Sequence, residues 1–126
     1  MSEKKYQIGS GLSISDNDRT FTKTINGDSW SLKIPLPPTK MAIARRTIEL
    51  SGGYTKDQIG ESEFEYIRSC VTIQSVLSDS PDWWDGVDNC TDDNLISELW
   101  RFYLDSENEF ASKLKTVRKS KSLGKP

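Results

Sequence analysis

Hydrophobic residues recur at intervals of three or four between residues 94 and 117, which is the spacing of one face of an α-helix. Ser106 fills the one polar position in this stripe, and no Gly or Pro interrupts it. Thr91, Asp92 or Asp93 can cap the start of the helix, because a short side-chain oxygen accepts hydrogen bonds from the first free N–H groups. At a rise of about 1.5 Å per residue the helix is roughly 36 Å long, so its hydrophobic face must pack against something. The stripe consists of Leu95, Leu99, Phe102, Tyr103, Phe110, Leu114 and Val117.

Two further segments have helical spacing, at residues 39–51 and 62–78. The first ends at a Gly-Gly pair, and the second begins with Ser62 and Glu65, whose spacing is that of a capping box. The hydrophobic stripe of the second segment is wide, so we expect it to be the most buried helix. With a helix over residues 92–118, these segments predict a three-helix bundle. In the first helix one row holds Met41, Ala44 and Ile48, and the neighbouring row holds Ile43, Thr47 and Leu50.

Residues 19–34 predict a β-hairpin. Polar and hydrophobic residues alternate on either side of an Asn-Gly pair at 26–27, which tolerates the positive φ angles of a tight turn. A lone hairpin is marginal in water, so its hydrophobic face must be covered. We favour packing on the helices of the same chain over pairing with the sheet of a neighbouring chain. That face holds Trp30, Leu32 and Ile34, and the strand ends at the proline-rich exit Pro35, Pro37 and Pro38.

These patterns together predict a mainly α fold, in which an N-terminal β-hairpin is followed by a three-helix bundle. A chain of 126 residues suits one domain with a modest core. Residues 1–18 predict a flexible lead, within which Leu12 and Ile14 can form a short edge strand. The folded domain then covers residues 19–118, and residues 119–126 form a disordered basic tail. The residues that we expect in the core are Ile67, Val71, Leu99 and Phe102.

Charge is distributed unevenly, although the net charge is only −2. Residues 79–109 hold ten carboxylates and one cation, Arg101, whereas residues 112–126 hold six cations and no carboxylate. The interpretation that we favour is a solvated acidic surface followed by a helix C-terminus whose positive charges match the helix dipole. The alternative is that the runs are acidic and basic docking sites. A pI of about 5.2 and the lack of a basic stripe interleaved with aromatic residues do not favour nucleic-acid binding.

No pattern typical of an enzyme or a metal site is present in the sequence. Histidine, the commonest general base and metal ligand at neutral pH, does not occur. A Gly-rich phosphate loop, a CxxC pair and a nucleophile elbow are also missing, and the carboxylates of residues 79–88 lack EF-hand spacing. Cys70 and Cys90 predict free thiols in a reducing cytoplasm, with Cys70 as a small core residue. Without these motifs we expect no catalysis, cofactor or metal. No hydrophobic run reaches membrane-spanning length, and the N-terminus lacks the hydrophobic core of a secretory signal, so we also expect no membrane partner.

Adjacent tryptophans, Trp83 and Trp84, occupy an acidic connection between the two longest predicted helices. Aromatic side chains bury large areas and often anchor interfaces, but tryptophan is also commonly buried within its own chain. Both interpretations stay open for this pair. Trp100 lies on the side of Ile96, away from the main stripe, and such a second hydrophobic side suits a contact with a subunit or partner.

The order of these features resembles the small tail assembly chaperones of long-tailed bacteriophages. A hairpin leads through KIPLPPTKMAIARR into a helix, FEYIRSCVTIQSVL ends at SPDWW, and LISELWRFYLDSENEF follows, so that the resemblance covers roughly residues 25–117. It implies a helical, non-enzymatic protein of the host cytoplasm that coats the tape measure protein and helps recruit tail tube subunits without a cofactor. The positions that the resemblance matches, and thereby implies for partner binding, are Trp83, Trp84, Trp100, Tyr103 and Phe110.

Two other classes fit the same sequence. One is a small virion structural protein, such as a head–tail completion or tube component, whose hairpin joins a neighbour's sheet. The other is a small regulatory binding module that uses the basic tail. A chaperone needs hydrophobic surface and a tendency to self-associate, so a homo-oligomer is compatible with the tail assembly chaperone interpretation.

Overall fold

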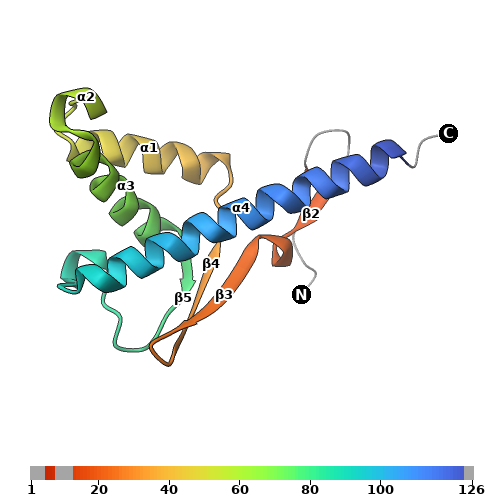
Figure 1. The fold of residues 1–126 in the computed structure, drawn as a ribbon, viewed down its shortest axis with the longest axis horizontal. Coiled ribbons are helices and arrows are strands. Elements are labelled where there is room, and N and C mark those ends of the chain that lie inside the picture. The colour runs from red at the N-terminus through yellow and green to blue at the C-terminus, as the bar shows by residue number, and fades with distance from the viewer. Residues whose placement is uncertain (1–4, 8–12, 124–126) are drawn as a thin grey trace.

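The computed structural model describes the backbone of residues 5–7 and 13–123 and the side chains of residues 14–116. Within that part of the chain, four α-helices accompany a three-stranded antiparallel sheet of order β3-β4-β5 and a separate two-stranded sheet, β1-β2 (Figure 1). The fold therefore mixes α and β structure, and the expectation of a hairpin on a plain three-helix bundle was too simple. The strands are β1 (Lys5–Gln7), β2 (Ser13–Ser15), β3 (Thr20–Ile25), β4 (Asp28–Lys33) and β5 (Leu77–Asp79). The helices are α1 (Pro37–Leu50), α2 (Lys56–Ile59), α3 (Glu61–Val76) and α4 (Asp93–Leu123), with short 3-10 turns at Asn17–Arg19 and Val87–Asn89.

The predicted hairpin is confirmed as β3 and β4, which pair from Thr20 opposite Lys33 to Ile25 opposite Asp28. The turn residues Asn26 and Gly27 have φ angles of 51° and 87°, the positive values for which an Asn-Gly pair is suited. The hydrophobic face of β4 packs within the chain, as favoured, because it forms one cluster with residues of α3 and α4. Its members Trp30, Leu32 and Ile34 are 0%, 1% and 4% exposed.

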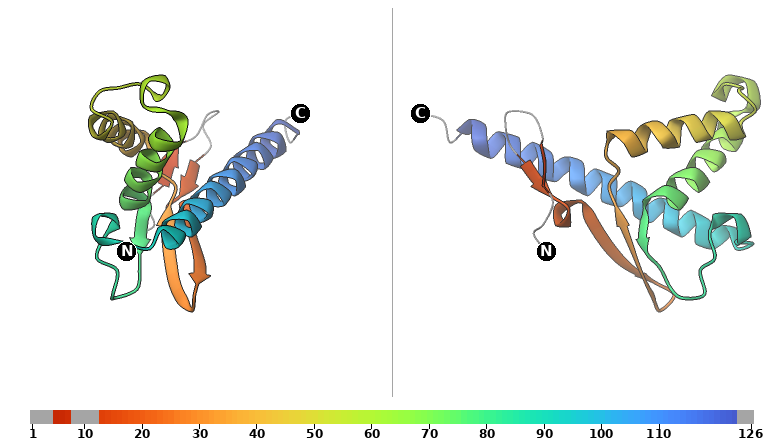
Figure 2. Two further views of the ribbon diagram at one scale, coloured as in Figure 1. Left: turned by 60° about the vertical axis from the view of Figure 1, so that its left-hand side comes forward. Right: turned by 180° about the vertical axis from the view of Figure 1, so that it is seen from behind.

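A third strand, β5, extends this sheet where we expected the end of a helix. The helix α3 stops at Val76, and Leu77 pairs with Leu32 across the free edge of β4, with a bulge in the register. Pairing with β4 satisfies backbone groups that a further helical turn before Pro81 would have left open. The loop that carries the adjacent tryptophans consequently starts from the sheet and returns to α4 (Figure 2).

The segment between residues 35 and 61 also differs from the expectation. Helix α1 begins at Pro37, because proline lacks only an N–H group that the first helical turn leaves unbonded in any case. The residues expected as a loop after α1 include the one-turn helix α2, which has the capping box, formed by Thr55 and Gln58. The capping box predicted at Ser62 and Glu65 is wrong, since Ser62 lies inside α3.

Helix α4 is the longest element and crosses the molecule beside the sheet and α3 (Figures 1 and 2). Asp92 caps it, since its Oδ1 accepts the N–H groups of Asn94 and Leu95 at 3.1 and 3.2 Å. Ser106 occupies the polar gap in the stripe as predicted; it is buried and donates to the carbonyl of Phe102 at 2.8 Å. The helix continues to Leu123, past the predicted start of a disordered tail at residue 119, and residues 124–126 lie outside the described part.

The N-terminal segment expected to be a flexible lead contains the paired strands β1 and β2, with Tyr6 opposite Ile14. The edge strand predicted at Leu12 and Ile14 corresponds to β2 at Ile14, whereas Leu12 lies outside the described residues. Arg19, after β2, is buried and donates to the backbone carbonyl of Ile34, which ties this segment to the hairpin. The division into lead, domain and tail stays a prediction.

The core lies between α3, α4 and the inner face of the sheet. Of the four predicted core residues, Val71, Leu99 and Phe102 are buried, while Ile67 is half-buried against them. The prediction that α3 is the most buried helix holds for the described side chains: five of 16 residues are buried in α3, six of 24 in α4 and two of 14 in α1. The fully buried side chains of the described region are Trp30, Leu32, Ile73 and Leu99.

Candidate protein-binding surfaces

Three tryptophans from distant parts of the sequence form one aromatic cluster. Trp30 of β4 contacts Trp83 and Trp84 edge to face, with ring centroids 5.8 and 5.1 Å apart, and the two loop rings are 6.4 Å apart. Trp84 is half-buried against the core, but Trp83 is 58% exposed. The interpretations left open for the pair therefore divide between its members: Trp84 packs on the core and Trp83 presents its ring to solvent.

Two hydrogen bonds fix the position of the tryptophan loop. The indole N–H of Trp83 donates to Oδ2 of Asp28, beside the hairpin turn, at 3.1 Å. The backbone N–H of Val87 donates to the side-chain oxygen of Gln74 on α3 at 3.0 Å, next to Gly86, whose φ of 93° a residue with Cβ would rarely adopt. The exposed ring of Trp83 is thus anchored to the sheet at one end of its loop and to α3 at the other.

Trp100 and Tyr103 form a second aromatic pair, stacked at 5.5 Å between centroids with an interplanar angle of 14°. The guanidinium carbon of Arg68 on α3 lies 5.2 Å from the centroid of Trp100, so α3 covers much of the side of α4 that we expected to be free. Tyr103 is 4% exposed, and its hydroxyl donates to Oε2 of Glu107 at 2.6 Å. Burial and that carboxylate raise the pKa of Tyr103, which keeps the hydroxyl protonated as a donor.

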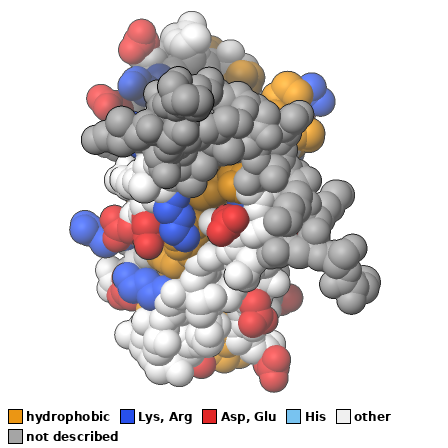
Figure 3. All heavy atoms as spheres, turned by 90° about the vertical axis from the view of Figure 1, so that its right-hand side faces the viewer, with side chains coloured by type: hydrophobic (Ala, Val, Ile, Leu, Met, Phe, Trp, Pro, Cys, Tyr) orange, Lys and Arg blue, Asp and Glu red, His pale blue; other side chains and the backbone are white. Residues whose placement is uncertain are grey.

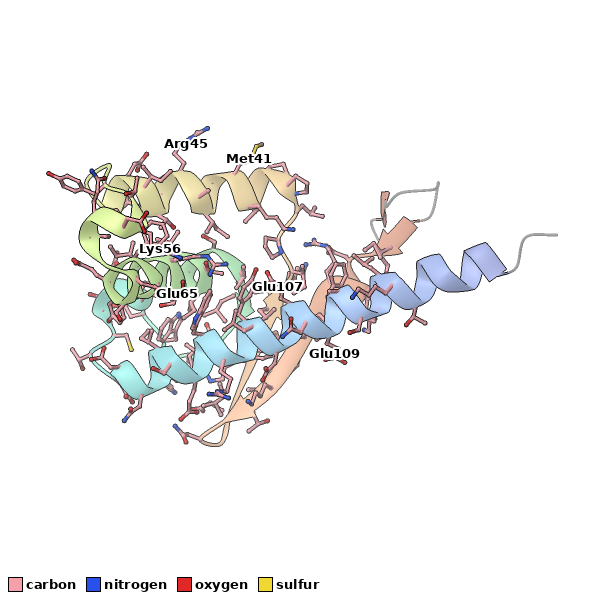
Figure 4. The ribbon with its side chains drawn as sticks, turned by 45° about the horizontal axis from the view of Figure 1, so that its top comes forward. Met41, Arg45, Lys56, Glu65, Glu107 and Glu109 are labelled. Carbon is pink, nitrogen blue, oxygen red and sulfur yellow. The ribbon has the colours of Figure 1, made fainter. Side chains whose placement is uncertain are left out.

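A groove between α1, α3 and α4 is a hydrophobic feature that the sequence did not reveal. It encloses about 400 Å³ and opens beside Ile48, which is 53% exposed. Met41 and Arg45 project from the outer side of α1, away from the body, whereas Glu107 projects from α4 at the groove (Figure 4). Lys40 and Arg68 add positive charge to its rim. Its hydrophobic walls are Pro35, Ile43, Ala44, Ile48, Phe64 and the ring of Tyr103.

A smaller hollow of about 390 Å³ lies along the C-terminal half of α4, against β2. Phe110 and Leu114 of α4 and Ile14 of β2 supply its hydrophobic lining, and Phe110 and Leu114 are only half-buried. Lys113 also borders it, with its Nζ 5.2 Å above the ring of Phe21. The hydrophobic stripe of α4 therefore continues along this hollow, past the part of the helix that the sheet and α3 cover.

The five predicted binding residues consequently lie at three places. Trp83 and Trp84 share the aromatic cluster, Trp100 and Tyr103 stack beside α3, and Phe110 lines the hollow. Among them Trp83 alone is exposed, whereas Tyr103 lines the groove although it is only 4% exposed. The groove residues of α1 were not predicted, because sequence spacing separates the rows of a helix without saying which row faces inward.

The two thiols are free, and burial raises the pKa of Cys70, which disfavours the nucleophilic thiolate. In the described residues, no group of three or more carboxylates or cysteines is placed to hold a metal ion. No helix in that same part of the chain is both long and hydrophobic enough to cross a bilayer. Comparisons of the chain with protein-family models, with curated proteins and with solved structures find no match.

Proposed function

We propose that this chain is a non-enzymatic protein-binding protein, namely a tail assembly chaperone of a long-tailed bacteriophage that holds the tape measure protein and helps recruit tail tube subunits in the host cytoplasm. The proposal rests on the resemblance in the order of elements and on the groove between α1, α3 and α4. The groove is the observation that carries it, since a chaperone for a long helical protein needs a hydrophobic surface open to solvent.

The chemistry of the groove suits an amphipathic helix. Its hydrophobic walls come from three helices, and packing a fourth helix there would cover Ile48 and Phe64. Lys40 and Arg68 lie at the rim, so carboxylates flanking the hydrophobic stripe of the partner would find opposite charge. Arg68 is already paired with Glu65 at 2.9 Å, which leaves Lys40 as the cation for such a contact.

Co-expression with the tape measure protein of the same phage tests the proposal. The tape measure protein should stay soluble and co-purify with the wild-type chain, and Ile48→Glu should weaken that complex at least about tenfold, because it places a carboxylate in the groove. Ile48 is exposed, so the variant should fold, and Leu114→Glu makes the same change outside the groove and should retain the complex. Equal binding by wild type and Ile48→Glu would refute the role of the groove.

Purified virions separate the chaperone from the alternative structural roles. A chaperone leaves before the tail is complete, so we expect no copy of the chain in mature particles by quantitative mass spectrometry. A fixed number of copies per particle would instead identify a head–tail completion or tube component.

A further inference from the structure

We infer that copies of this chain associate head to tail, with Trp83 of one copy seated in the hollow beside Phe110 and Leu114 of the next. The inference rests on the two surfaces themselves and does not require the proposed function. The proposed occupant of the hollow is a second copy of the chain, and the hollow shares no lining residue with the groove.

Trp83 is suited to be the inserting residue. It is 58% exposed, yet its ring contacts Trp30 and Trp84 and its N–H group is held by Asp28 at 3.1 Å. Ordering a side chain that is already held costs little conformational entropy on binding, and buried tryptophans are common anchors of interfaces. The same fixed ring cannot turn inward, because Trp84 already packs against the core beneath it.

The hollow is suited to receive such a ring. Its volume of about 390 Å³ has a hydrophobic lining from Ile14, Phe110 and Leu114, with Lys113 at its border. Figure 3 views the molecule from the side to which the C-terminal end of α4 points, and it shows hydrophobic side chains between positive and negative ones on this face. The ammonium group of Lys113 at the edge of the hollow can also attract the face of the inserted indole ring, which favours the contact.

Charge complementarity selects a second copy as the occupant. The tryptophan loop and the start of α4 carry six carboxylates and no cation over residues 79–93, and residues 112–126 carry six cations and no carboxylate. In the described part of the chain, no ion pair includes any of those six carboxylates, nor Lys113 or Lys115. Two carboxylates, Asp18 and Glu109, also border the hollow. Asp18 accepts hydrogen bonds from the backbone N–H and the hydroxyl of Ser15. The carboxylates of the loop are Asp79, Asp82, Asp85, Asp88, Asp92 and Asp93.

The two surfaces cannot meet within one chain. Trp83 is bonded to Asp28 at the turn of the hairpin, whereas Phe21, near the other end of β3, lies under Lys113 of the hollow. Four residue steps of β3 separate Phe21 from Ile25, which pairs with Asp28, and at roughly 3.3 Å per residue they span about 13 Å. The contact is therefore between copies, and we infer that it is heterologous, each copy using its two surfaces on two different neighbours; repetition of such a contact produces rings or open chains rather than a closed dimer.

Sedimentation velocity of the purified full chain tests the inference. We expect the average mass to rise with concentration past that of a dimer, and to fall when salt is raised from about 50 to about 500 mM, because exposed charges are screened. Trp83→Ala and Leu114→Glu should each weaken association at least about tenfold. Tyr54→Ala, which removes a similarly exposed ring elsewhere, and Ile48→Glu should associate like the wild type.

Mixing the two defective variants gives the decisive result. Trp83→Ala keeps an intact hollow and Leu114→Glu keeps an intact loop, so an equimolar mixture should form one-to-one dimers although neither variant associates alone. A wild-type chain that stays monomeric at about 1 mM, or that stops at a dimer, would overturn the inference. So would a mixture that stays monomeric while circular dichroism shows both variants folded. Ile48→Glu loses the partner complex and Leu114→Glu loses self-association, so failure of one proposal is distinguishable from failure of the other.

Discussion

Truncation of Leu99 to alanine should lower the free energy of unfolding by about 3–5 kcal/mol. Leu99 is 1% exposed and shares the core cluster with Trp30 and Ile73, which are equally buried. Removing three carbon atoms from such a site loses about 2.4 kcal/mol of transfer free energy, at about 0.8 kcal/mol for each. The remainder comes from the cavity, which the surrounding structure cannot fill, because α4, α3 and the sheet hold the neighbouring side chains in place.

Urea unfolding followed by tryptophan fluorescence measures this effect, since the cluster of Trp30, Trp83 and Trp84 should change its emission when the sheet separates from the loop. At roughly 4 °C per kcal/mol, the melting temperature should fall by at least about 12 °C. Leu50→Ala is the matched control, because Leu50 is 50% exposed on α1 and the same truncation there should change stability by less than about 0.5 kcal/mol.

The outcome that would refute the reasoning is a loss below about 1 kcal/mol for Leu99→Ala with an unchanged slope of the unfolding free energy against urea. Equal losses at Leu99 and Leu50 would have the same force. Either result would mean that α4 does not pack on the sheet and α3 through the row containing Leu99.

Three further substitutions test other parts of the fold. The pKa of Tyr103 is raised, so the stability it supplies is complete below the ordinary value of about 10 and is lost as pH rises above it; Tyr103→Phe should flatten an alkaline melting profile. Hydrogen bonds from Lys33 and Arg19 lower the pKa of Asp16 from 3.8 to about 2, so its contribution is lost as pH falls from about 4 towards 2, and Asp16→Asn should remove that part of an acid unfolding curve. Gly27→Ala should cost about 1 kcal/mol or more in urea unfolding, because Gly27 has a φ of 87° although nothing lies near its missing Cβ.

The sequence was informative where structure depends on local chemistry. The Asn-Gly turn, the alternation of β4 and the stripe of α4 are each decided by residues close together in the chain, and all three were predicted. Strand β5 was missed because three residues carry no periodicity, and Leu77 joins the sheet only because the edge of β4 is there to pair with it. Tertiary pairing overrode the helical pattern at that point.

The binding surfaces were less predictable, for a related reason. Exposure of Trp83 and burial of Trp84 depend on where Trp30 lies, 53 positions earlier in the chain, counting from Trp30 to Trp83. The two rows of α1 are about equally hydrophobic, and only packing against α3 decides that Ile43 is buried while Ile48 stays exposed, although both line the groove. Spacing therefore identifies the candidates on an element, and the arrangement of elements decides which of them reach solvent.

The length of α4 links the two proposed surfaces. At Tyr103 and Glu107 the helix borders the groove, and at Phe110 and Leu114 it borders the hollow, so one stripe with spacings of four, three and four residues serves both. The sheet and α3 cover the earlier part of that stripe, whereas the later part extends past the body of the domain (Figure 1). Within this later part Phe110 still packs against the core, whereas Leu114 is not part of that cluster. The proposed contact with another copy accounts for a hydrophobic residue at that position.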